Sequence, residues 1–390
     1  MRRTHVKLVS LVALLLLLGT ACTADDDGAD AEAGGEAGVT APAAGEGGTD
    51  VAQGGGEGGG EAAAAGEMLG DVQSRGTLRC GVNDTVPGFG FTGEDGEFVG
   101  FDVEFCQVIA TAVLGDPEAV EYIPLTAQQR FTAIQSGEID VLSRNTTWTS
   151  TRDGSEGAAF APVVFYDGQG MMVPADSEFQ ELADMQNTVI CVQQGTTTEL
   201  NLATVFNAQG IPYEPNVSED NNIVIENFSS GACDGFTSDK SQLAGIRSNW
   251  PEDQGGPEAL RILDATMSKE PLAPAVVDGD SDWKDAVTWA VLATIQAEEF
   301  GITSDNIDEF VQSEDPEIRR FLGLPGGEDN AVPDFGLGLD PEFAQNVVRE
   351  VGNYGEIYER NLGPDTPLGL ERGQNALWTE GGLLYSPPFR

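Results

Sequence analysis

From about residue 75 to residue 300, the chain alternates short apolar, β-branched runs with amphipathic segments. This alternation, at the spacing of strands and helices, is typical of an α/β fold. In the first half of the region the pattern predicts strands at 77–82, 121–124 and 139–142 and helices at 100–114 and 130–135.

A second α/β unit follows, after residues 168–174 carry the chain out of the first. Its predicted elements are strands at 188–193, 223–226 and 233–238 and a helix that begins after 195–199. Residues 270–277 return to the first unit, and 283–300 form a strongly apolar helix. This path predicts two lobes joined by crossovers near 172–176 and 267–273, with a cleft that can close on a ligand.

The 320 residues from Asp71 to Arg390 exceed what one hydrophobic core usually supports, which also favours two lobes. Residues 331–390 contain aromatic residues without a clear period, and we expect an ordered extension packed over the lobes. The predicted boundaries are 1–21 for a signal peptide, 22–70 for an acylated tether, 71–174 and 269–330 for lobe 1, 175–268 for lobe 2 and 331–390 for the C-terminal extension.

The N-terminal segment has the pattern of an export signal. Basic residues precede an 11-residue apolar run at 8–18, and small residues then precede Cys22. A membrane-spanning helix needs about 20 apolar residues, so this run is too short to be one. We expect a bacterial lipoprotein signal with Cys22 as the acylated residue; an ordinary cleaved signal peptide that carries a cysteine is the alternative.

Residues 23–70 form a Gly/Ala/Glu/Asp tract with 11 acidic residues and no aromatic residue, lysine or arginine. Such a tract cannot bury enough apolar surface to offset its ordering entropy. We interpret it as a flexible tether. The expected location is therefore outside the cell interior, lipid-anchored to the outer face of the cytoplasmic membrane.

The formal net charge is −46, and loss of Arg2, Arg3 and Lys7 with the signal takes it to −49. So acidic a chain repels nucleic acid and anionic lipid, which excludes direct binding to a phosphate backbone. The only histidine is His5, inside the signal peptide. The mature chain thus lacks the imidazole of Ser-His-Asp and Cys-His catalysis and of His-ligated metal sites, and we expect no enzyme activity, metal or cofactor.

Four cysteines follow Cys22, an even number that predicts two disulfides in an exported chain. Pairing Cys80 with Cys106 and Cys191 with Cys233 would keep each bridge within one lobe. The sequence leaves three pairings open, and four buried thiols are the alternative.

A polar loop after a predicted strand, residues 140–152, carries the first candidate ligand-binding groups. Arg152 offers a planar fork that can hold a carboxylate through two parallel hydrogen bonds. Thr147 and Thr149 place hydroxyls and backbone groups in the same turn. The alternative is a solvated loop in which Arg152 pairs with Asp153 or another surface acid.

The second lobe offers two further candidates. Gly195, Thr196 and Thr197 suit an oxyanion at a helix N-terminus, and an ordinary helix cap is compatible with that role. Asp239 ends a predicted strand and would face the cleft. Taken alone, it is better interpreted as the cap of a helix that begins near Ser241.

Residues 140–152 resemble the Asp-x6-Thr-x-Thr-x2-Arg signature of polar amino-acid-binding proteins of ABC transporters. The resemblance implies that Arg152, assisted by Thr147, clamps the α-carboxylate of the ligand. It implies that the turn at 195–197 touches this carboxylate from the opposite wall and that Asp239 takes the α-ammonium.

The same resemblance bears on other positions. Asn145 stands where that family often has glycine, and its backbone carbonyl is expected to meet the ammonium. Ala127 stands where narrowly specific members cover the ligand with an aromatic residue, which leaves room for varied side chains. Trp148 and Tyr166 are the aromatic residues that we select as candidates for the pocket wall.

Further blocks resemble one branch, the general L-amino-acid-binding proteins of bacterial extracellular solute-binding protein family 3. They are 78–83, 143–149, 166–170, 194–202, 351–361 and 370–378. The resemblance implies a two-lobed α/β periplasmic-binding-protein fold (type II). It also implies a substrate-binding protein that delivers free L-amino acids, with broad specificity, to the permease subunits of an ABC importer. We expect a monomer that is anchored through Cys22.

Two alternative functions stay open. A dehydratase-like enzyme on the same fold would need a general acid or base, and without histidine that task would fall on a cleft acid such as Asp239. A ligand-sensing module would need a transmembrane helix or a signalling domain downstream, whereas the sequence ends at Arg390.

Overall fold

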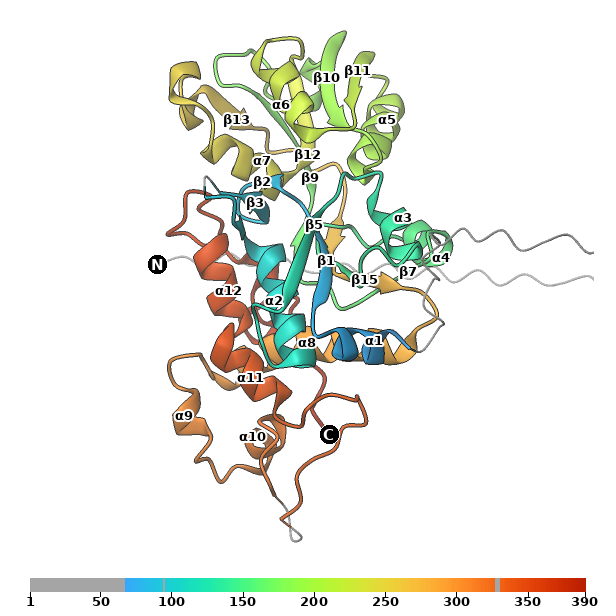
Figure 1. Ribbon diagram of the computed structural model, residues 1–390. Helices are drawn as coiled ribbons and strands as arrows, with labels where there is room; N and C mark the ends of the chain where they lie inside the picture. The colour runs from blue at the N-terminus through green and yellow to red at the C-terminus, as the bar shows by residue number, and fades with distance from the viewer. Residues whose placement is uncertain (1–66, 94, 327–329) are drawn as a thin grey trace, which may run out of the picture. The chain divides into compact units, whose positions relative to one another are not determined.

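The computed structural model describes residues 67–93, 95–326 and 330–390, so the predicted signal peptide, Cys22 and most of the tether lie outside the described residues (Figure 1). Lobe 1 is built on a five-stranded sheet in the order β5, β1, β6, β15, β7. The strands are β1 (Leu78–Val82), β5 (Val120–Pro124), β6 (Val141–Leu142), β7 (Ala158–Phe160) and β15 (Ala275–Val277). β5 and β6 run parallel to β1, and β15 joins antiparallel from the returning chain.

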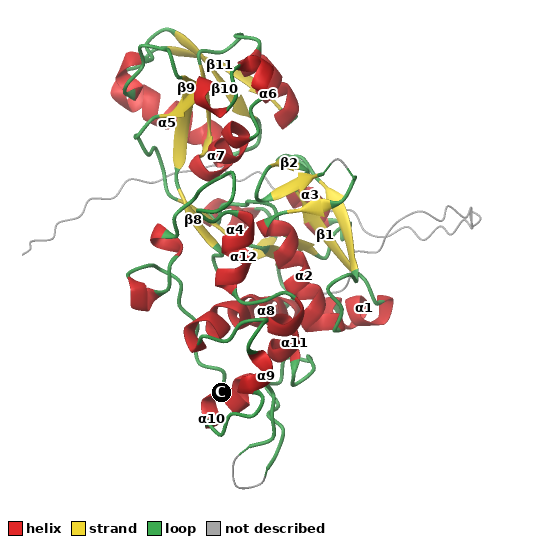
Figure 2. Ribbon diagram, turned by 90° about the vertical axis from the view of Figure 1, so that its left-hand side faces the viewer, coloured by secondary structure: helices red, strands yellow, loops and turns green. Residues whose placement is uncertain are grey.

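Lobe 2 has its own five-stranded sheet, in the order β11, β10, β12, β9, β13. Its strands are β9 (Gln169–Pro174), β10 (Thr188–Gln193), β11 (Tyr213–Ser218), β12 (Gly235–Asp239) and β13 (Leu260–Ile262). Its helices are α5 (Thr197–Gln209), α6 (Asn221–Ser229) and α7 (Lys240–Ser248), with α5 and α6 on opposite sides of the sheet (Figure 2). Helices can cover both faces of the sheet because successive side chains of β9 point to opposite faces. Met171 belongs to the hydrophobic cluster on one face and Met172 to the cluster on the other.

A two-stranded sheet lies where the chain crosses between the lobes. β8 (Phe165–Asp167) pairs antiparallel with β14 (Glu270–Leu272). The first crossover comes earlier than the predicted 172–176, since all of Gln169–Pro174 forms β9 and pairs within the lobe 2 sheet. Lobe 2 therefore begins near residue 168 rather than at 175.

The predicted strand at 223–226 is wrong, because these residues lie in the helix α6. Asp220 caps this helix by accepting a hydrogen bond from the Asn222 N–H at 2.8 Å. Val224 and Phe228, four residues apart, are buried on one face, whereas Ile223 is exposed. The β-branched run misled the prediction. β10 instead pairs on its outer side with the half-exposed edge strand β11, and on its inner side with β12.

Most of the helices in the described residues belong to lobe 1. Its helices are α1 (Met68–Arg75), α2 (Phe101–Leu114), α3 (Arg130–Gln135), α4 (Ser150–Ser155), α8 (Ser281–Phe300), α9 (Ile307–Phe310), α10 (Pro316–Phe321), α11 (Phe343–Glu350) and α12 (Tyr354–Asn361). A small antiparallel sheet of β2 (Thr85–Val86), β3 (Gly90–Thr92) and β4 (Phe98–Val99) sits beside α2. Single 3₁₀ turns occur at Leu182–Asp184, Glu252–Gln254, Pro257–Ala259, Gly373–Asn375 and Trp378–Glu380.

The C-terminal residues share the core of lobe 1. α11 and α12 both pack on α2 and α8, and Val347, Tyr354 and Phe389 are buried in the same cluster as Phe101 and Trp283. The sequence pattern did not reveal these two helices. Along the described part of the chain, no helix is both long and apolar enough to cross a membrane.

Two disulfides are formed, one in each lobe. Cys80 on β1 is bonded to Cys106 on α2, and Cys191 on β10 is bonded to Cys233 in the turn before β12. Of the three pairings that the sequence left open, this is the one in which each bridge ties a central strand of a sheet to a neighbouring element of the same lobe.

Candidate functional site

Arg152 is the third residue of α4. Its spacing of three residues from Thr149 is that between a helix cap and the third residue of the helix. Thr149 is the N-cap, and its hydroxyl accepts a hydrogen bond from the Arg152 N–H at 3.3 Å. The Arg152 side chain turns inward, where Nη1 donates to the Thr147 carbonyl at 2.8 Å and the guanidinium lies 5.4 Å from the Phe131 ring centroid. No acidic side chain of the described residues forms an ion pair with it, so the alternative pairing with Asp153 is not observed.

Glu270, at the start of β14, is a central residue of the site that the sequence did not reveal. Its carboxylate is buried and accepts hydrogen bonds from the Thr147 hydroxyl at 2.6 Å and from the Thr197 hydroxyl at 2.8 Å. Asn201 of α5 donates to it at 2.9 Å, and Ser268 donates as well. Because Thr147 belongs to lobe 1 and Thr197 to lobe 2, Glu270 links both walls of the cleft.

The turn before α5 forms the wall that faces Arg152. Thr196 caps the helix by accepting from the Glu199 N–H at 3.1 Å, and the Gly195 N–H donates to the Glu199 carboxylate at 2.9 Å. Gly195 has φ +75°, and a Cβ there would lie 2.8 Å from the Gln128 side chain of lobe 1. The two walls therefore approach each other closely at a residue that must be glycine.

Asp239 ends β12, and its side chain makes no capping hydrogen bond to α7. The cap interpretation is therefore not observed. Its Oδ1 is buried and has no hydrogen-bond partner among the described residues. Burial, reinforced by the carboxylates of Asp167 and Glu270, raises the pKa of Asp239 well above its usual value, against the opposing effect of Arg152 and Arg130.

Asp167, half-buried at the end of β8, lies close enough to Asp239 and Glu270 for their charges to interact. Its carboxylate accepts a hydrogen bond from the Ser241 N–H at 3.2 Å and another from the Ser241 hydroxyl. Burial raises the pKa of Asp167 to about 6, although the hydrogen bonds from Ser241 and Gly168 lower it. Carboxylates that avoid water in this way favour a cation as their partner.

Asn145 lies between the two lobes in a backbone conformation unusual for a residue other than glycine, with φ +31°. Its N–H donates to Asp102 at 2.6 Å, and its side-chain amide donates to Gln242 of α7 at 3.3 Å. Burial raises the pKa of Asp102 to about 7, and the Asn145 N–H and the charge of Arg144 oppose this shift. Asparagine tolerates the left-handed region better than most residues, which explains its presence at this turn.

A cavity of about 500 Å³ opens between the lobes beside Arg152. Lobe 1 lines it with Ala127, Gln128, Phe131, Thr149, Thr151, Arg152 and Glu156, and lobe 2 with Gly195, Thr196, Thr197, Glu199, Leu200 and Asn201. Of the predicted aromatic candidates, Trp148 stacks on Phe160 with 40% of its surface exposed, and Tyr166 lies in β8. Neither lines this cavity.

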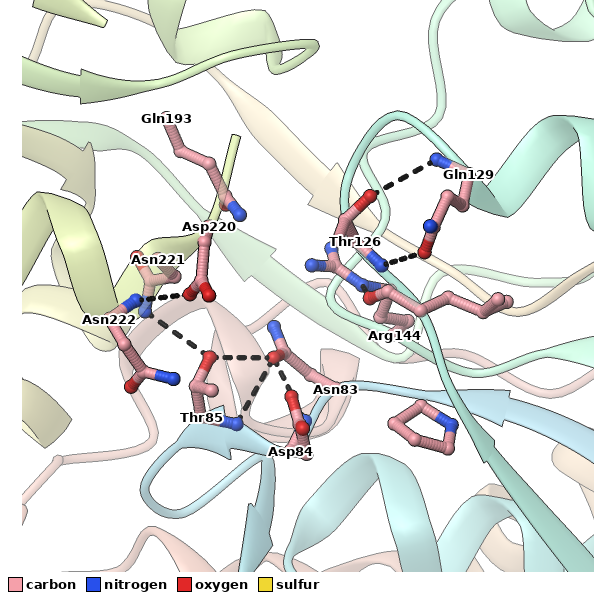
Figure 3. Close-up of a pocket in the computed structure, with 12 residues that line it drawn as sticks. Asn83, Asp84, Thr85, Thr126, Gln129, Arg144, Gln193, Asp220, Asn221 and Asn222 are labelled. Atoms are coloured by element: carbon pink, nitrogen blue, oxygen red, sulfur yellow. Dashed lines mark hydrogen bonds between the residues drawn. The ribbon is translucent and has the colours of Figure 1, made fainter. Parts of the chain in front are cut away.

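A smaller polar cavity of about 190 Å³ lies farther along the same cleft (Figure 3). Asn83 and Thr85 of lobe 1 face Asn221 of lobe 2, whose amide donates to the Thr85 hydroxyl at 3.3 Å. Arg144 borders the same space, and its Nε donates to the Leu125 carbonyl at 2.7 Å. The cleft therefore offers polar space beyond the immediate surroundings of Arg152.

The model of a protein family, described as bacterial extracellular solute-binding proteins, family 3, matches residues 78–307. The chain belongs to this family. The expected two-lobed α/β periplasmic-binding-protein fold (type II) is thereby confirmed, and the protein is a member of a group of exported solute-binding proteins.

Relatives within family 3 match along most of their length. The general L-amino acid-binding periplasmic protein AapJ of Rhizobium johnstonii is 48% identical over 322 residues, which cover 83% of this chain and 92% of that protein. The glutamate/glutamine/aspartate/asparagine-binding protein BztA of Rhodobacter capsulatus is 46% identical, with coverages of 83% and 93%. An ABC transporter periplasmic binding protein from Brucella ovis, solved with glutathione bound, has a TM-score of 0.79 and 43% identity, and covers 84% of this chain and 100% of its own.

Proposed function

We propose that this protein binds free L-amino acids with broad specificity in the cleft between its lobes and delivers them to the permease subunits of an ABC importer. The observations that carry the proposal are the buried guanidinium of Arg152, which lines the cavity between the lobes, and the buried carboxylate of Asp239, which is unpartnered within the described residues and whose charge acts on that guanidinium. An amino acid zwitterion brings one negative and one positive group, and each is costly to bury without a fixed partner. The names of the relatives AapJ and BztA support the same ligand class.

In the proposed complex the α-carboxylate lies on Arg152 and the α-ammonium on Asp239. The Thr147 hydroxyl already donates to Glu270, so its help to the ligand carboxylate would come from its backbone N–H. Gly195, Thr196 and Thr197 approach from lobe 2 as the cleft closes. Binding and closure are the whole of the proposed activity, and we propose a monomer that carries out no chemical reaction.

A pair of variants tests the two charged contacts. Arg152→Ala should weaken the binding of every L-amino acid by about 100-fold or more, because two charge-assisted hydrogen bonds to the α-carboxylate are lost. Asp239→Asn should weaken amino acids but spare 2-hydroxy acids, which have no ammonium. Calorimetry measures the affinities of both variants for L-amino acids, 2-hydroxy acids and glutathione. Unchanged affinity in Arg152→Ala, or equal loss of both ligand classes in Asp239→Asn, would contradict the assignment.

Affinity should also depend on pH. A carboxyl with a raised pKa is protonated at a higher pH than usual, so its attraction for an ammonium is present at high pH and lost as the pH falls. Asp167 has a pKa of about 6, and the pKa of its neighbour Asp239 is raised. We expect weaker binding as the pH falls through about 6, with proton release on binding in calorimetry. Constant affinity between about pH 5 and pH 8 would refute this coupling.

Closure brings α7 against lobe 1 at Gly245. A Cβ at this position would lie 2.5 Å from the Pro87 carbonyl oxygen, closer than van der Waals contact permits. Gly245→Ala should therefore weaken ligand binding, although alanine favours the helix itself by about 1 kcal/mol. Gly70→Ala in α1 is a matched control, because a Cβ there meets nothing within 4 Å. Calorimetry and small-angle scattering with ligand measure the effect, and equal affinities in both variants would be inconsistent with it.

We further propose that Cys22 is acylated and anchors the protein to the outer face of the cytoplasmic membrane. Its position after an apolar run and small residues supports this. Cys22→Ala should move the protein from the membrane fraction to the soluble exported fraction, measured by fractionation and by mass spectrometry of the N-terminus. If wild type and variant fractionate alike, the anchor proposal fails.

A further inference from the structure

One side chain of the C-terminal extension holds the outer edge of β8, in the sheet that crosses between the lobes. Asn375 accepts a hydrogen bond from the Tyr166 N–H at 2.6 Å and donates to the Tyr166 carbonyl at 3.2 Å. Tyr166 lies opposite Pro271 of β14, which has no N–H to donate, so the backbone groups of Tyr166 are satisfied on the other side. The amide of Asn375 therefore takes the place of a third strand.

Asn375 is itself fixed to the helices of lobe 1. Only 4% of it is exposed, and its carbonyl accepts a hydrogen bond from Arg372 Nε at 2.9 Å. The Arg372 guanidinium lies 4.9 Å from the ring centroid of Tyr358 on α12 and forms an ion pair of 3.0 Å with Glu298 on α8. We call residues 371–375 the strap, since they connect these helices to β8.

Two residues after Tyr166, the chain is held by lobe 2 instead. The Gly168 carbonyl accepts a hydrogen bond from the Lys240 N–H of α7 at 2.9 Å, and β9 begins at Gln169. Asp167 is the residue between the two attachments. With the strap in place, bending of this crossover is therefore limited to the surroundings of Asp167, and β8 stays with lobe 1.

The sheet that the strap completes also carries the ligand loop. At the opposite edge, the Pro271 carbonyl accepts a hydrogen bond from the Trp148 N–H at 2.8 Å, next to Thr147. β14 begins at Glu270, which accepts hydrogen bonds from both walls of the cleft. From one edge to the other, the layer consists of the ligand loop, β14, β8 and the strap. A displacement of β8 therefore reaches the cleft through hydrogen bonds.

We infer that Asn375 is a positioning residue for ligand binding, which holds β8 against lobe 1 and thereby favours the closed form. The inference rests on the proposed function for the identity of the ligand. Asn375 lines neither cavity of the cleft, so its effect on the ligand passes through β8. The walls touch in this structure, with the Thr147 and Thr197 hydroxyl oxygens 3.3 Å apart, so the held position of β8 is one that permits closure. When β8 gains other positions, the closed fraction and the affinity fall together.

Asn375→Leu tests the inference, because it keeps the size of the side chain and removes both bonds to Tyr166. It should lower the affinity for L-glutamate, L-glutamine and L-leucine by a similar factor of about fivefold or more, since closure and not a side-chain contact is affected. Calorimetry measures the affinities, and Asn375→Ala provides the same comparison if the leucine variant fails to fold. Unchanged affinities beside a lower melting temperature would overturn the inference, since the contact would then only stabilise the fold. A loss confined to one ligand would overturn it as well.

Asn306→Leu is a matched control in lobe 1. Asn306 also accepts a hydrogen bond from one backbone N–H, that of Thr303 at 2.7 Å, and donates to one carbonyl, that of Gly301 at 2.9 Å. It precedes α9, which packs on α11. This variant should leave all three affinities unchanged. An equal loss of affinity in Asn306→Leu and Asn375→Leu would assign the effect to a general loosening of lobe 1 and overturn the inference.

Hydrogen exchange, followed by mass spectrometry, tests the coupling in the wild type. Because coupling is reciprocal, saturating L-glutamine should slow exchange in the strap by about threefold or more, although the strap lies outside both cavities. Residues 303–307 should exchange at the same rate with and without ligand. Exchange in the strap that does not respond to the ligand would overturn the inference without any variant.

A final comparison separates this inference from the proposed function. If the wild type binds no L-amino acid, the proposed function fails, and small-angle scattering of the unliganded proteins then tests the strap alone. Asn375→Leu should have a larger radius of gyration than the wild type and than Asn306→Leu, because its lobes spend more time apart. Identical scattering from all three proteins would overturn the role of the strap in closure.

Discussion

The cleft depends on Glu270, a buried carboxylate that no cation of the described residues pairs with, held where the chain crosses between the lobes. Its oxygens accept hydrogen bonds from Thr147 on one wall and from Thr197 and Asn201 on the other. A carboxylate removed from water needs such donors, and the donors of both walls reach it together only when the lobes meet, whereas Ser268 donates from beside it in the chain. We therefore expect closure of the lobes to complete the hydrogen bonding of Glu270, which would couple the hinge to the walls that contact the ligand.

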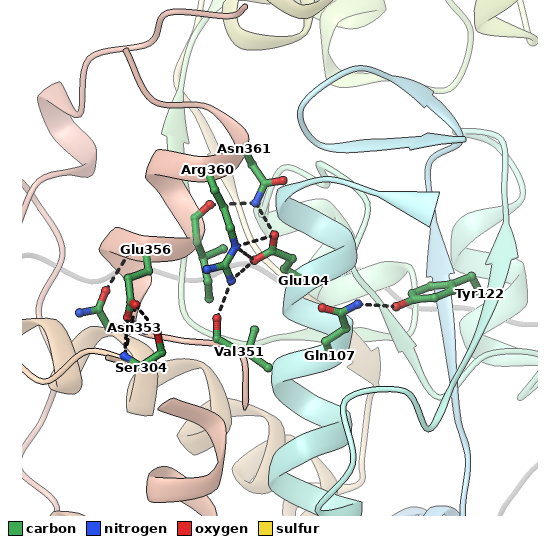
Figure 4. Close-up of polar contacts among 10 residues, drawn as sticks. Glu104, Gln107, Tyr122, Ser304, Val351, Asn353, Glu356, Arg360 and Asn361 are labelled. Carbon is green, nitrogen blue, oxygen red and sulfur yellow. Dashed lines mark hydrogen bonds and ion pairs between the residues drawn. The ribbon is translucent and has the colours of Figure 1, made fainter. Parts of the chain in front are cut away.

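Such a hinge works only if each lobe moves as a rigid body, and lobe 1 is fixed by its C-terminal helices. Glu104 of α2 accepts hydrogen bonds from Arg360 at 2.8 Å and from Asn361 at 2.7 Å, both on α12 (Figure 4). Asn353 and Glu356 cap the same helix reciprocally. Together with the two disulfides, these contacts oppose deformation within a lobe. The strand pair β8–β14 and its flanking residues are then the natural place for motion.

The sequence predicted what depends on local spacing. The order of strands and helices follows from hydrophobic periodicity, and the Thr-x2-Arg spacing at Thr149 and Arg152 is that of a helix cap and its third residue. It could not reveal Glu270, because its hydrogen-bond partners Thr147 and Thr197 lie far away in the chain. At 223–226 a β-branched run outweighed the four-residue period of the α6 helix, and β11 was missed because an exposed edge strand carries no apolar signature.

Buried positive charges are gathered around the cleft, although the chain as a whole is strongly acidic. The chain has a net charge of −46, yet three of its arginines are buried around the cleft: Arg130, Arg144 and Arg152. At physiological ionic strength, exposed charges are screened beyond about 8 Å, whereas buried ones are screened much less. An acidic ligand approaching the protein therefore meets a damped repulsion from the surface and a stronger local attraction within the cleft. The overall acidity governs how the protein behaves toward membranes and nucleic acid, while these few buried arginines govern, on the proposed function, which anions the cleft holds.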